Sequence, residues 1–83
     1  MKYVARIEVS LKPGHSNPEG ETTAKLLLEL GYKVTTVDVS KVYTVTIETD
    51  ALSDAKAKAE EMSKRLLTNP TKDNYTISVV EMK

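Results

Sequence analysis

The sequence predicts an α+β fold, an antiparallel sheet with two helices on one face. Three observations lead to this class: segments of alternating apolar and polar residues typical of strands, two amphipathic segments typical of helices, and the order in which the two kinds follow one another. We expect one domain over residues 1–83, because a chain this short encloses a single thin core. Hydrophobic burial at this size only narrowly outweighs chain entropy, so a homodimer or higher homo-oligomer is expected.

The first half of the chain predicts one strand and one helix. The strand is expected over Lys2–Leu11, where every second residue is apolar. The helix is expected from about Pro18 to Leu30. Asn17 suits the N-cap, Pro18 the first helical position, and Gly31 the left-handed conformation that ends a helix.

Two further strands are predicted within Val34–Thr49, where the alternation returns. We expect them to form a hairpin, with Val37 and Val39 before a turn at Ser40-Lys41. That pair lacks the Asn-Gly preference of tight hairpins, so periodicity alone supports the turn. The turn type and a slightly offset pairing therefore stay open.

A second helix follows, with Asp50 or Ser53 as its N-cap. Its apolar face comprises Ala55, Ala59, Met62 and Leu66. Asn69 is expected to end it in a left-handed conformation, Pro70 prevents its continuation, and a fourth strand includes Tyr75. The order β-α-β-β-α-β predicts a ferredoxin-like sandwich, because both βαβ crossovers should be right-handed and place the helices on one sheet face.

Composition argues against several kinds of partner. Twelve basic and twelve acidic residues cancel without forming blocks, so neither nucleic acid nor a membrane is an expected partner. An RNA-binding sheet face is also disfavoured, because Tyr3, Tyr43 and Tyr75 fall on the core phase of the strands. Cysteine is absent and the N-terminus lacks the apolar stretch of a signal peptide, so we expect a cytoplasmic protein.

The sequence contains no recognisable catalytic set. His15 is the single histidine, and neither a metal-ligand spacing nor a nucleophile motif accompanies it. We therefore expect no catalytic residue, no metal ligand and no cofactor-binding residue in this chain.

The connection from Leu11 to Gly20 holds two prolines and two glycines and is longer than a small domain needs. It could cradle an anion at the start of the first helix, although Glu19 and Glu21 already occupy that place. It could also be a rigid loop without a partner. We favour a partner-facing loop, because prolines reduce the entropy lost on docking.

Several short motifs carry a resemblance to a known family: Leu11-Lys12-Pro13-Gly14, Asn17-Pro18-Glu19-Gly20, Leu30-Gly31-Tyr32, Leu66-Leu67-Thr68-Asn69-Pro70 and Tyr75. In their order and spacing, which span nearly the whole chain, the sequence resembles the PurS family. This is the small subunit of phosphoribosylformylglycinamidine synthase, an enzyme of purine biosynthesis.

The resemblance implies the same fold and a non-catalytic dimer within a larger complex. The implied partners are a glutaminase subunit, which releases ammonia, and an ATP-dependent synthetase subunit, which converts formylglycinamide ribonucleotide to formylglycinamidine ribonucleotide. The chain would bridge the two and support ammonia transfer. ATP and Mg²⁺ would be used by the complex, and no cofactor would be bound by this chain.

The resemblance also implies residues that contact a partner or fix a loop: Lys12, Pro13, Gly14, Asn17, Pro18, Gly20, Lys41, Asn69 and Pro70. Turn and cap geometry alone could select Gly14, Pro18, Gly20 and Asn69. Lys12 and Lys41 have no such duty in the sequence and are expected to contact a partner.

Two other functional classes stay open. The first is a stand-alone dimeric module of ferredoxin-like fold that binds a small ligand. The second is an acylphosphatase-like enzyme, which would need an arginine beside a glycine-rich loop. It is the weaker of the two, because Arg6 and Arg65 are predicted on a strand face and a helix face.

Overall fold

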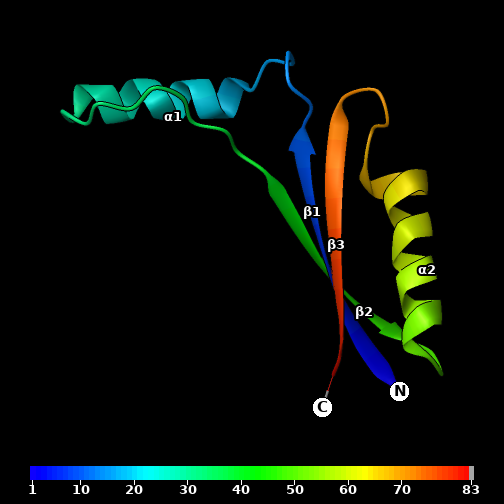
Figure 1. Cartoon of the computed structure of the whole chain (residues 1–83). Helices are drawn as coiled ribbons and strands as arrows, with labels where there is room; N and C mark the ends of the chain where they lie inside the picture. Colours follow the sequence, from blue (N-terminus) through cyan, green and yellow to red (C-terminus); the bar gives the residue numbers. More distant parts are fainter. Residues whose placement is uncertain (83) are drawn as a thin grey trace.

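A computed structural model describes residues 1–82 as a three-stranded antiparallel sheet with one helix packed on it and another projecting beyond its end (Figure 1). Strand β1 lies in the centre, between β2 and β3. The elements are β1 (Lys2–Leu11), α1 (Pro18–Glu29), β2 (Lys41–Glu48), α2 (Leu52–Met62), the π-helical turn η1 (Ser63–Leu67) and β3 (Asp73–Glu81). The predicted α+β, ferredoxin-like class is confirmed, with an antiparallel sheet as expected.

The core lies between the sheet and α2. Strand β1 buries every second side chain as its alternation predicts, and Ala5 and Ile7 are completely buried. Ala55 and Ala59 of α2 are buried against this face, and their small side chains allow the helix to approach the strands closely. The fold of this half therefore follows from two matching apolar faces.

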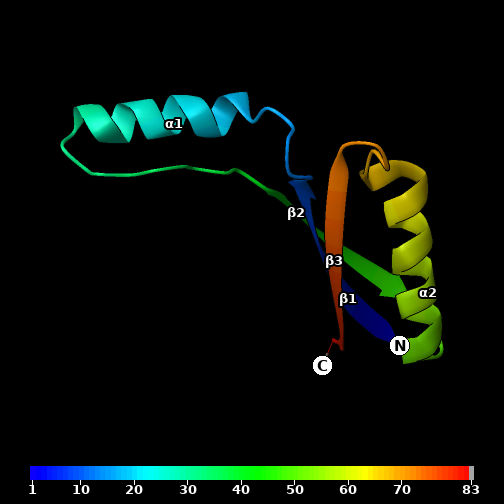
Figure 2. The same ribbon diagram turned by 45° about the horizontal axis from the view of Figure 1, so that its top comes forward.

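The predicted hairpin is wrong, because the structure forms no strand from Val34 to Val39. This segment instead runs back beside α1 and enters β2 without a turn (Figure 2). The spacing of the apolar residues, a signal that the hairpin prediction missed, explains why this segment runs straight into β2. A two-residue turn at Ser40-Lys41 would place Val39 and Val42 on the same face, whereas Val37 and Val39 share their odd numbering with Tyr43, Val45 and Ile47 of β2. Apolar residues that keep the same parity on both sides of Ser40-Lys41 are typical of one straight strand rather than of a hairpin.

Helix α1 begins and ends as predicted, although it does not cover the sheet. Asn17 is the N-cap, and its side-chain oxygen accepts a hydrogen bond from the Gly20 amide at 3.0 Å. At the other end Gly31 takes a φ of 97°, and the amides of Gly31 and Tyr32 bond the carbonyls of Leu28 and Leu27 at 3.0 Å each. The expectation of two helices on one sheet face is fulfilled by α2 alone (Figure 1).

The second helix differs from its prediction at both ends. Its N-cap is Ala51 rather than Asp50 or Ser53, although Thr49 donates a side-chain hydrogen bond to Asp54 in the first turn. At the far end, η1 inserts an extra residue into the helical turn. Leu67 is therefore the residue that packs against the core, and Leu66, the predicted core residue, is 82% exposed.

Asn69 does not take the predicted left-handed conformation. Glycines alone have positive φ among the described residues. The helix ends instead at Thr68, whose extended backbone leaves the helical path and whose hydroxyl donates to the Ser63 carbonyl at 2.7 Å. The π-helical turn thus supplies the termination that the sequence assigned to Asn69.

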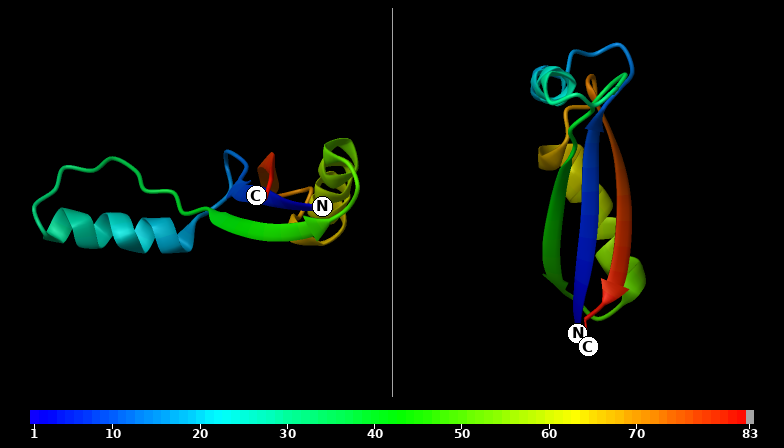
Figure 3. Two further views of the ribbon diagram at one scale, coloured as in Figure 1. Left: turned by 90° about the horizontal axis from the view of Figure 1, so that it is seen from below. Right: turned by 90° about the vertical axis from the view of Figure 1, so that its left-hand side faces the viewer.

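The molecule is elongated, with principal extents of 51 × 30 × 14 Å (Figure 3). Its radius of gyration is 16.4 Å, whereas a compact domain of this length has about 12 Å. We call residues 17–39, which contain α1 and the segment returning from it, the arm. The arm accounts for the excess length. None of the described helices is long and apolar enough to cross a membrane.

Candidate partner-binding loop end

Most of the residues singled out from the sequence gather at one end of the sheet. Strand β1 ends there, and β2 and β3 both begin there, because each pairs with β1 antiparallel. Val9 stands opposite Lys41, and Leu11 stands opposite Asp73. We call this the loop end: residues 10–20, 38–41 and 67–75. It is the upper end of the sheet in Figure 1.

Lys12 joins two loops that are far apart in the sequence. Its backbone amide donates to the Lys72 carbonyl at 2.6 Å, and its side-chain ammonium donates to the Pro70 carbonyl at 2.8 Å. The sequence assigned no structural duty to Lys12, and this expectation is corrected. An ammonium has three protons, so the remaining two can still reach a partner's carboxylate or carbonyl.

Asn69 and Asp73 shape the loop that Lys12 holds. The Asn69 side-chain oxygen accepts from the Thr71 amide at 3.0 Å, while Asp73 accepts from the Asn69 amide at 2.8 Å. These bonds form an Asx turn, which satisfies backbone amides that would otherwise depend on water. The turn leaves Pro70 and Thr71 exposed at the surface. Asn69 therefore fixes the conformation of the loop, and the loop exposes Pro70 at the surface.

Asn17 and Gly20 connect the loop end to the arm. Besides capping α1, Asn17 donates from its side-chain nitrogen to the Val39 carbonyl at 3.2 Å. A methyl group at Gly20 would lie 2.0 Å from the Val37 carbonyl oxygen, so only glycine permits this close approach. Pro18 occupies the first helical position. These three residues have structural roles in the arm.

The remaining predicted residues lie on the surface. Pro13 and Gly14 are exposed at the tip of the first loop, where Gly14 takes a φ of 90° with open space around it. Lys41 is exposed at the start of β2. A cavity of about 460 Å³ lies between the first loop and residues 38–40. These surface residues are the ones available to a partner.

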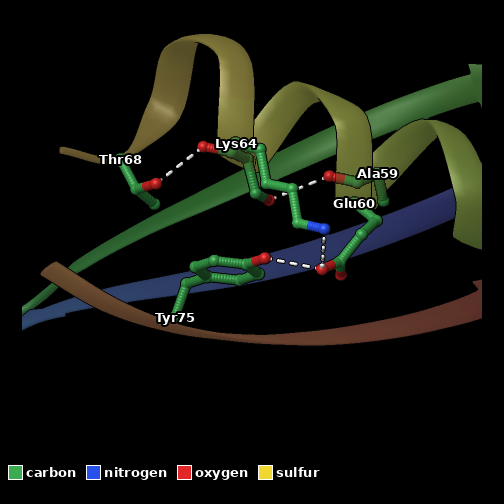
Figure 4. Close-up of polar contacts among 6 residues, drawn as sticks. Ala59, Glu60, Lys64, Thr68 and Tyr75 are labelled. Carbon is green, nitrogen blue, oxygen red and sulfur yellow. Dashed lines mark hydrogen bonds and ion pairs between the residues drawn. The ribbon is translucent and has the colours of Figure 1, made fainter. Parts of the chain in front are cut away.

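A contact between Tyr75 and Glu60 beside the loop end was missed by the sequence reasoning (Figure 4). The Tyr75 hydroxyl donates to Glu60 at 2.6 Å, and the Lys64 ammonium lies 3.6 Å from the same oxygen. The hydrogen bond to Glu60, with smaller effects of burial and the carboxylate charge, raises the pKa of Tyr75 above its ordinary 10.0. The sequence could have indicated this contact, because a tyrosine predicted on the core side of a strand needs a hydrogen-bond partner for its hydroxyl.

This cluster borders a second cavity of about 640 Å³, whose lining reaches from Tyr75 and Lys64 to Lys12 and Pro70. Glu60 is bonded to Tyr75 and paired with Lys64, and His15 is exposed in the first loop. Among residues 1–82, no group of acidic or histidine side chains is arranged to hold a metal ion. The loop end is thus an exposed surface whose loops are joined by hydrogen bonds, an arrangement suited to docking.

Comparison with known proteins places this geometry in a family. Residues 4–81 match the family model PurS, described as phosphoribosylformylglycinamidine (FGAM) synthase. The chain belongs to the PurS family. The phosphoribosylformylglycinamidine synthase subunit PurS of Methanothermobacter thermautotrophicus is 38% identical over 82 residues, which cover 99% of this chain and 98% of that protein.

Solved structures of PurS proteins share the fold. PurS from Thermus thermophilus matches over the whole of both chains with a TM-score of 0.91 and 31% identity. The solved structure of PurLQS from Thermotoga maritima includes a chain that matches with a TM-score of 0.87, covering 96% of this chain and 99% of that one. Its identity is 22%, so this second likeness shows the fold alone.

Proposed function

We propose that this chain is the small, non-catalytic subunit of phosphoribosylformylglycinamidine synthase and that it holds the glutaminase and synthetase subunits together. The observation that carries the proposal is the match to the PurS family over residues 4–81. ATP and Mg²⁺ then belong to the synthetase subunit, and the complex works in the cytoplasm.

The loop end is the surface that we assign to these partners. Its exposed residues Pro13, Gly14 and Pro70 stand on loops joined or shaped by the Lys12–Pro70 and Asn69–Asp73 hydrogen bonds. Lys41, also exposed, begins β2 at the same end of the sheet. A surface ordered before binding loses less entropy on docking. By keeping the two partner subunits in a fixed relation, the chain supports transfer of ammonia from glutaminase to synthetase.

A reconstitution assay tests the proposal. The synthetase and glutaminase subunits from the same organism are assayed for formylglycinamidine ribonucleotide formation, with and without this chain, and with either glutamine or ammonium chloride as nitrogen source. We expect glutamine-dependent formation to require the chain, whereas ammonium-dependent formation does not, because free ammonia bypasses the glutaminase. Full glutamine-dependent activity without the chain would overturn the proposal.

A matched pair of variants tests the loop end. Lys41→Glu reverses an exposed charge at the loop end, and Lys56→Glu makes the same change on the exposed surface of α2. We expect Lys41→Glu to weaken assembly with the partner subunits at least about tenfold, since a rim charge of the wrong sign opposes docking. Equal assembly by both variants would remove the loop end from the interface.

We also propose that the chain functions as a homodimer. A sheet of three strands covered by one helix is a small core for 83 residues. The arm adds little to it, because Gly20 is the one buried residue of the arm, all of which the structure describes. A second copy is the natural source of the missing burial.

A further inference from the structure

The cavity of about 640 Å³ at the loop end has two lysines in its walls. It lies between the end of β1, the turn η1 and the start of β3, and we call it the lysine pocket. Its lining includes Lys12, Lys64, Thr68, Pro70, Asp73 and Tyr75. Most of these residues belong to the loop end. A partner that docks on the loop end therefore also meets this pocket.

The charge of the Lys12 ammonium is not neutralised within the chain. The ammonium donates to the Pro70 carbonyl at 2.8 Å, and this acceptor carries no formal charge. Among residues 1–82, no carboxylate oxygen lies within 4 Å of it. Two of its three protons remain available to another acceptor. Lys12 is thus held in place at the pocket while its charge stays unpaired.

The Lys64 ammonium is only loosely neutralised. It lies 3.6 Å from Glu60 Oε1, which is farther than a hydrogen bond reaches, and the same oxygen already accepts the Tyr75 hydroxyl at 2.6 Å (Figure 4). The side chain of Lys64 is 66% exposed, so water screens its attraction to Glu60. Its protons are therefore available for a stronger contact on the side of the pocket.

The rest of the lining supplies little negative charge. Asp73 is the one carboxylate among the described residues that line the pocket, and it already accepts a hydrogen bond from the Asn69 amide at 2.8 Å. Pro70 and the ring of Tyr75 add apolar surface. Two ammonium groups in one pocket repel each other, and an anion placed between them removes this repulsion. The pocket thus lacks an anion rather than a cation.

This combination suits a carboxylate on a short apolar stem. An aspartate or glutamate side chain could place its oxygens between the two ammonium groups and its methylene groups on Pro70 and Tyr75. A free phosphate fits less well, because it is commonly bound by backbone amides at a helix N-terminus. The helix that begins at the loop end, α1, carries Glu19 and Glu21 in its first turn. The observations favour an acidic side chain of another protein.

We propose that the lysine pocket binds an acidic side chain of a partner subunit, whose carboxylate lies between Lys12 and Lys64. The inference rests on the proposed function, because a partner subunit supplies the carboxylate. It adds the chemistry of the contact to that function. Attraction between opposite charges speeds association and weakens as salt screens it, so assembly through this pocket depends on ionic strength.

Lys64→Gln removes one of the two charges, and Lys58→Gln is the matched control. Each substitution breaks one i,i+4 ion pair, of 3.6 Å with Glu60 or 3.7 Å with Asp54, so both should change the stability of the chain by similar small amounts. Biolayer interferometry with the immobilised chain measures binding of the glutaminase and synthetase subunits at about 50 and about 500 mM potassium chloride.

We expect Lys64→Gln to weaken binding at least about tenfold at the lower salt concentration and to reduce the loss of affinity between the two concentrations. Lys58→Gln should bind as the wild type does at both. A purely structural role of Lys64 would not change the dependence on salt. Equal binding by the two variants would overturn the proposal, and the subunit function would still stand if the wild-type chain assembles.

Carbodiimide crosslinking of the assembled complex identifies the occupant. The reagent activates a carboxylate, a lysine amine in contact with it then forms an amide, and the reagent leaves as a urea. Mass spectrometry of the digested complex should show Lys12 or Lys64 joined to an aspartate or glutamate of a partner subunit. A crosslink from these lysines to a second copy of this chain, in place of a partner subunit, would overturn the proposal.

Titration of the isolated chain with inorganic phosphate tests for a free anion in the pocket. Saturable binding below about 1 mM that is lost in Lys64→Gln would assign the pocket to a small anion and overturn the proposal. We expect no such binding. A wild-type chain that fails to assemble with either subunit overturns the proposed function and this inference together, whereas the variants and the crosslinks decide the inference by itself.

Discussion

The sheet with α2 and the arm with α1 are two halves of one chain. Their sequence patterns are similar, but their helices differ in how much of the apolar face is buried. Both helices are amphipathic and both follow a strand of alternating residues. Helix α2 buries Ala55 and Ala59 on the sheet, whereas α1 buries only Gly20 among its residues, all of which the structure describes. An apolar stripe therefore shows that a helix will be covered, but it does not show by which surface.

The two halves are held by different interactions. The sheet half depends on apolar packing around Ile7, where removal of side-chain volume leaves a cavity. The arm depends on a few local contacts at its root, the Asn17 bonds and the close approach of Gly20 to Val37. Substitutions in the core of the sheet half should lower the global free energy of unfolding. Substitutions at the root of the arm should instead loosen the arm alone.

The largest effect is expected from Ile7→Ala. Ile7 is completely buried at the centre of the sheet, and its truncation should lower the free energy of unfolding by about 3 kcal/mol. Urea denaturation followed by circular dichroism measures the change. Val80→Ala, on an exposed position of β3, is the control and should change stability by less than about 0.5 kcal/mol. Equal losses would mean that the core does not lie where the burial places it.

Gly20→Ala should act on the arm. Alanine favours a helix over glycine by about 1 kcal/mol, yet here its methyl group would collide with the Val37 carbonyl. We expect a net loss of about 1–2 kcal/mol of local stability. It should appear as faster hydrogen exchange of the α1 amides with those of α2 unchanged.

Thr22→Ala is the control for Gly20→Ala, because it adds helix propensity at an exposed position of α1. Its α1 amides should exchange no faster than in the wild type. Slower exchange in Gly20→Ala as well would show that the approach of Val37 does not hold the arm.

Asn17→Ala should have a smaller effect in the same place. It removes the N-cap of α1 and the hydrogen bond to the Val39 carbonyl, and loss of such a cap costs about 1 kcal/mol. Hydrogen exchange of the first-turn amides measures it, with Ser16→Ala, an exposed neighbour, as the control. No difference between the two variants would contradict the capping role.

The smallest effect concerns the Tyr75–Glu60 bond in the sheet half. Because the folded state raises the pKa of Tyr75, this bond stabilises the fold below pH 10 and its contribution is lost as the pH rises further. Ultraviolet titration of the tyrosines should show one group that ionises late in the wild type. In Glu60→Ala that group should ionise earlier, whereas Glu61→Ala, beside it and unbonded to Tyr75, should leave the titration unchanged.

Local features were predictable because they depend on neighbouring residues. The start of α1 at Asn17-Pro18, its end at Gly31 and the burial phase of β1 all appear in the structure as the sequence predicts. The site residues also gather at one end of the sheet, since β1 ends where β2 and β3 begin. The hydrogen bond from Lys12 to Pro70 was not predictable, because it joins residues 58 positions apart.

The sequence by itself determined the strands β1, β2 and β3, both helices and the family to which the chain belongs. It also contained evidence against a hairpin, because Val37 and Val39 share their odd numbering with Tyr43, Val45 and Ile47. Tertiary structure alone decided that α1 leaves the sheet and that η1 turns Leu67 inward in place of Leu66. The reason is physical: a pattern of apolar residues specifies which side of an element is buried, whereas the surface that buries it depends on contacts between distant segments.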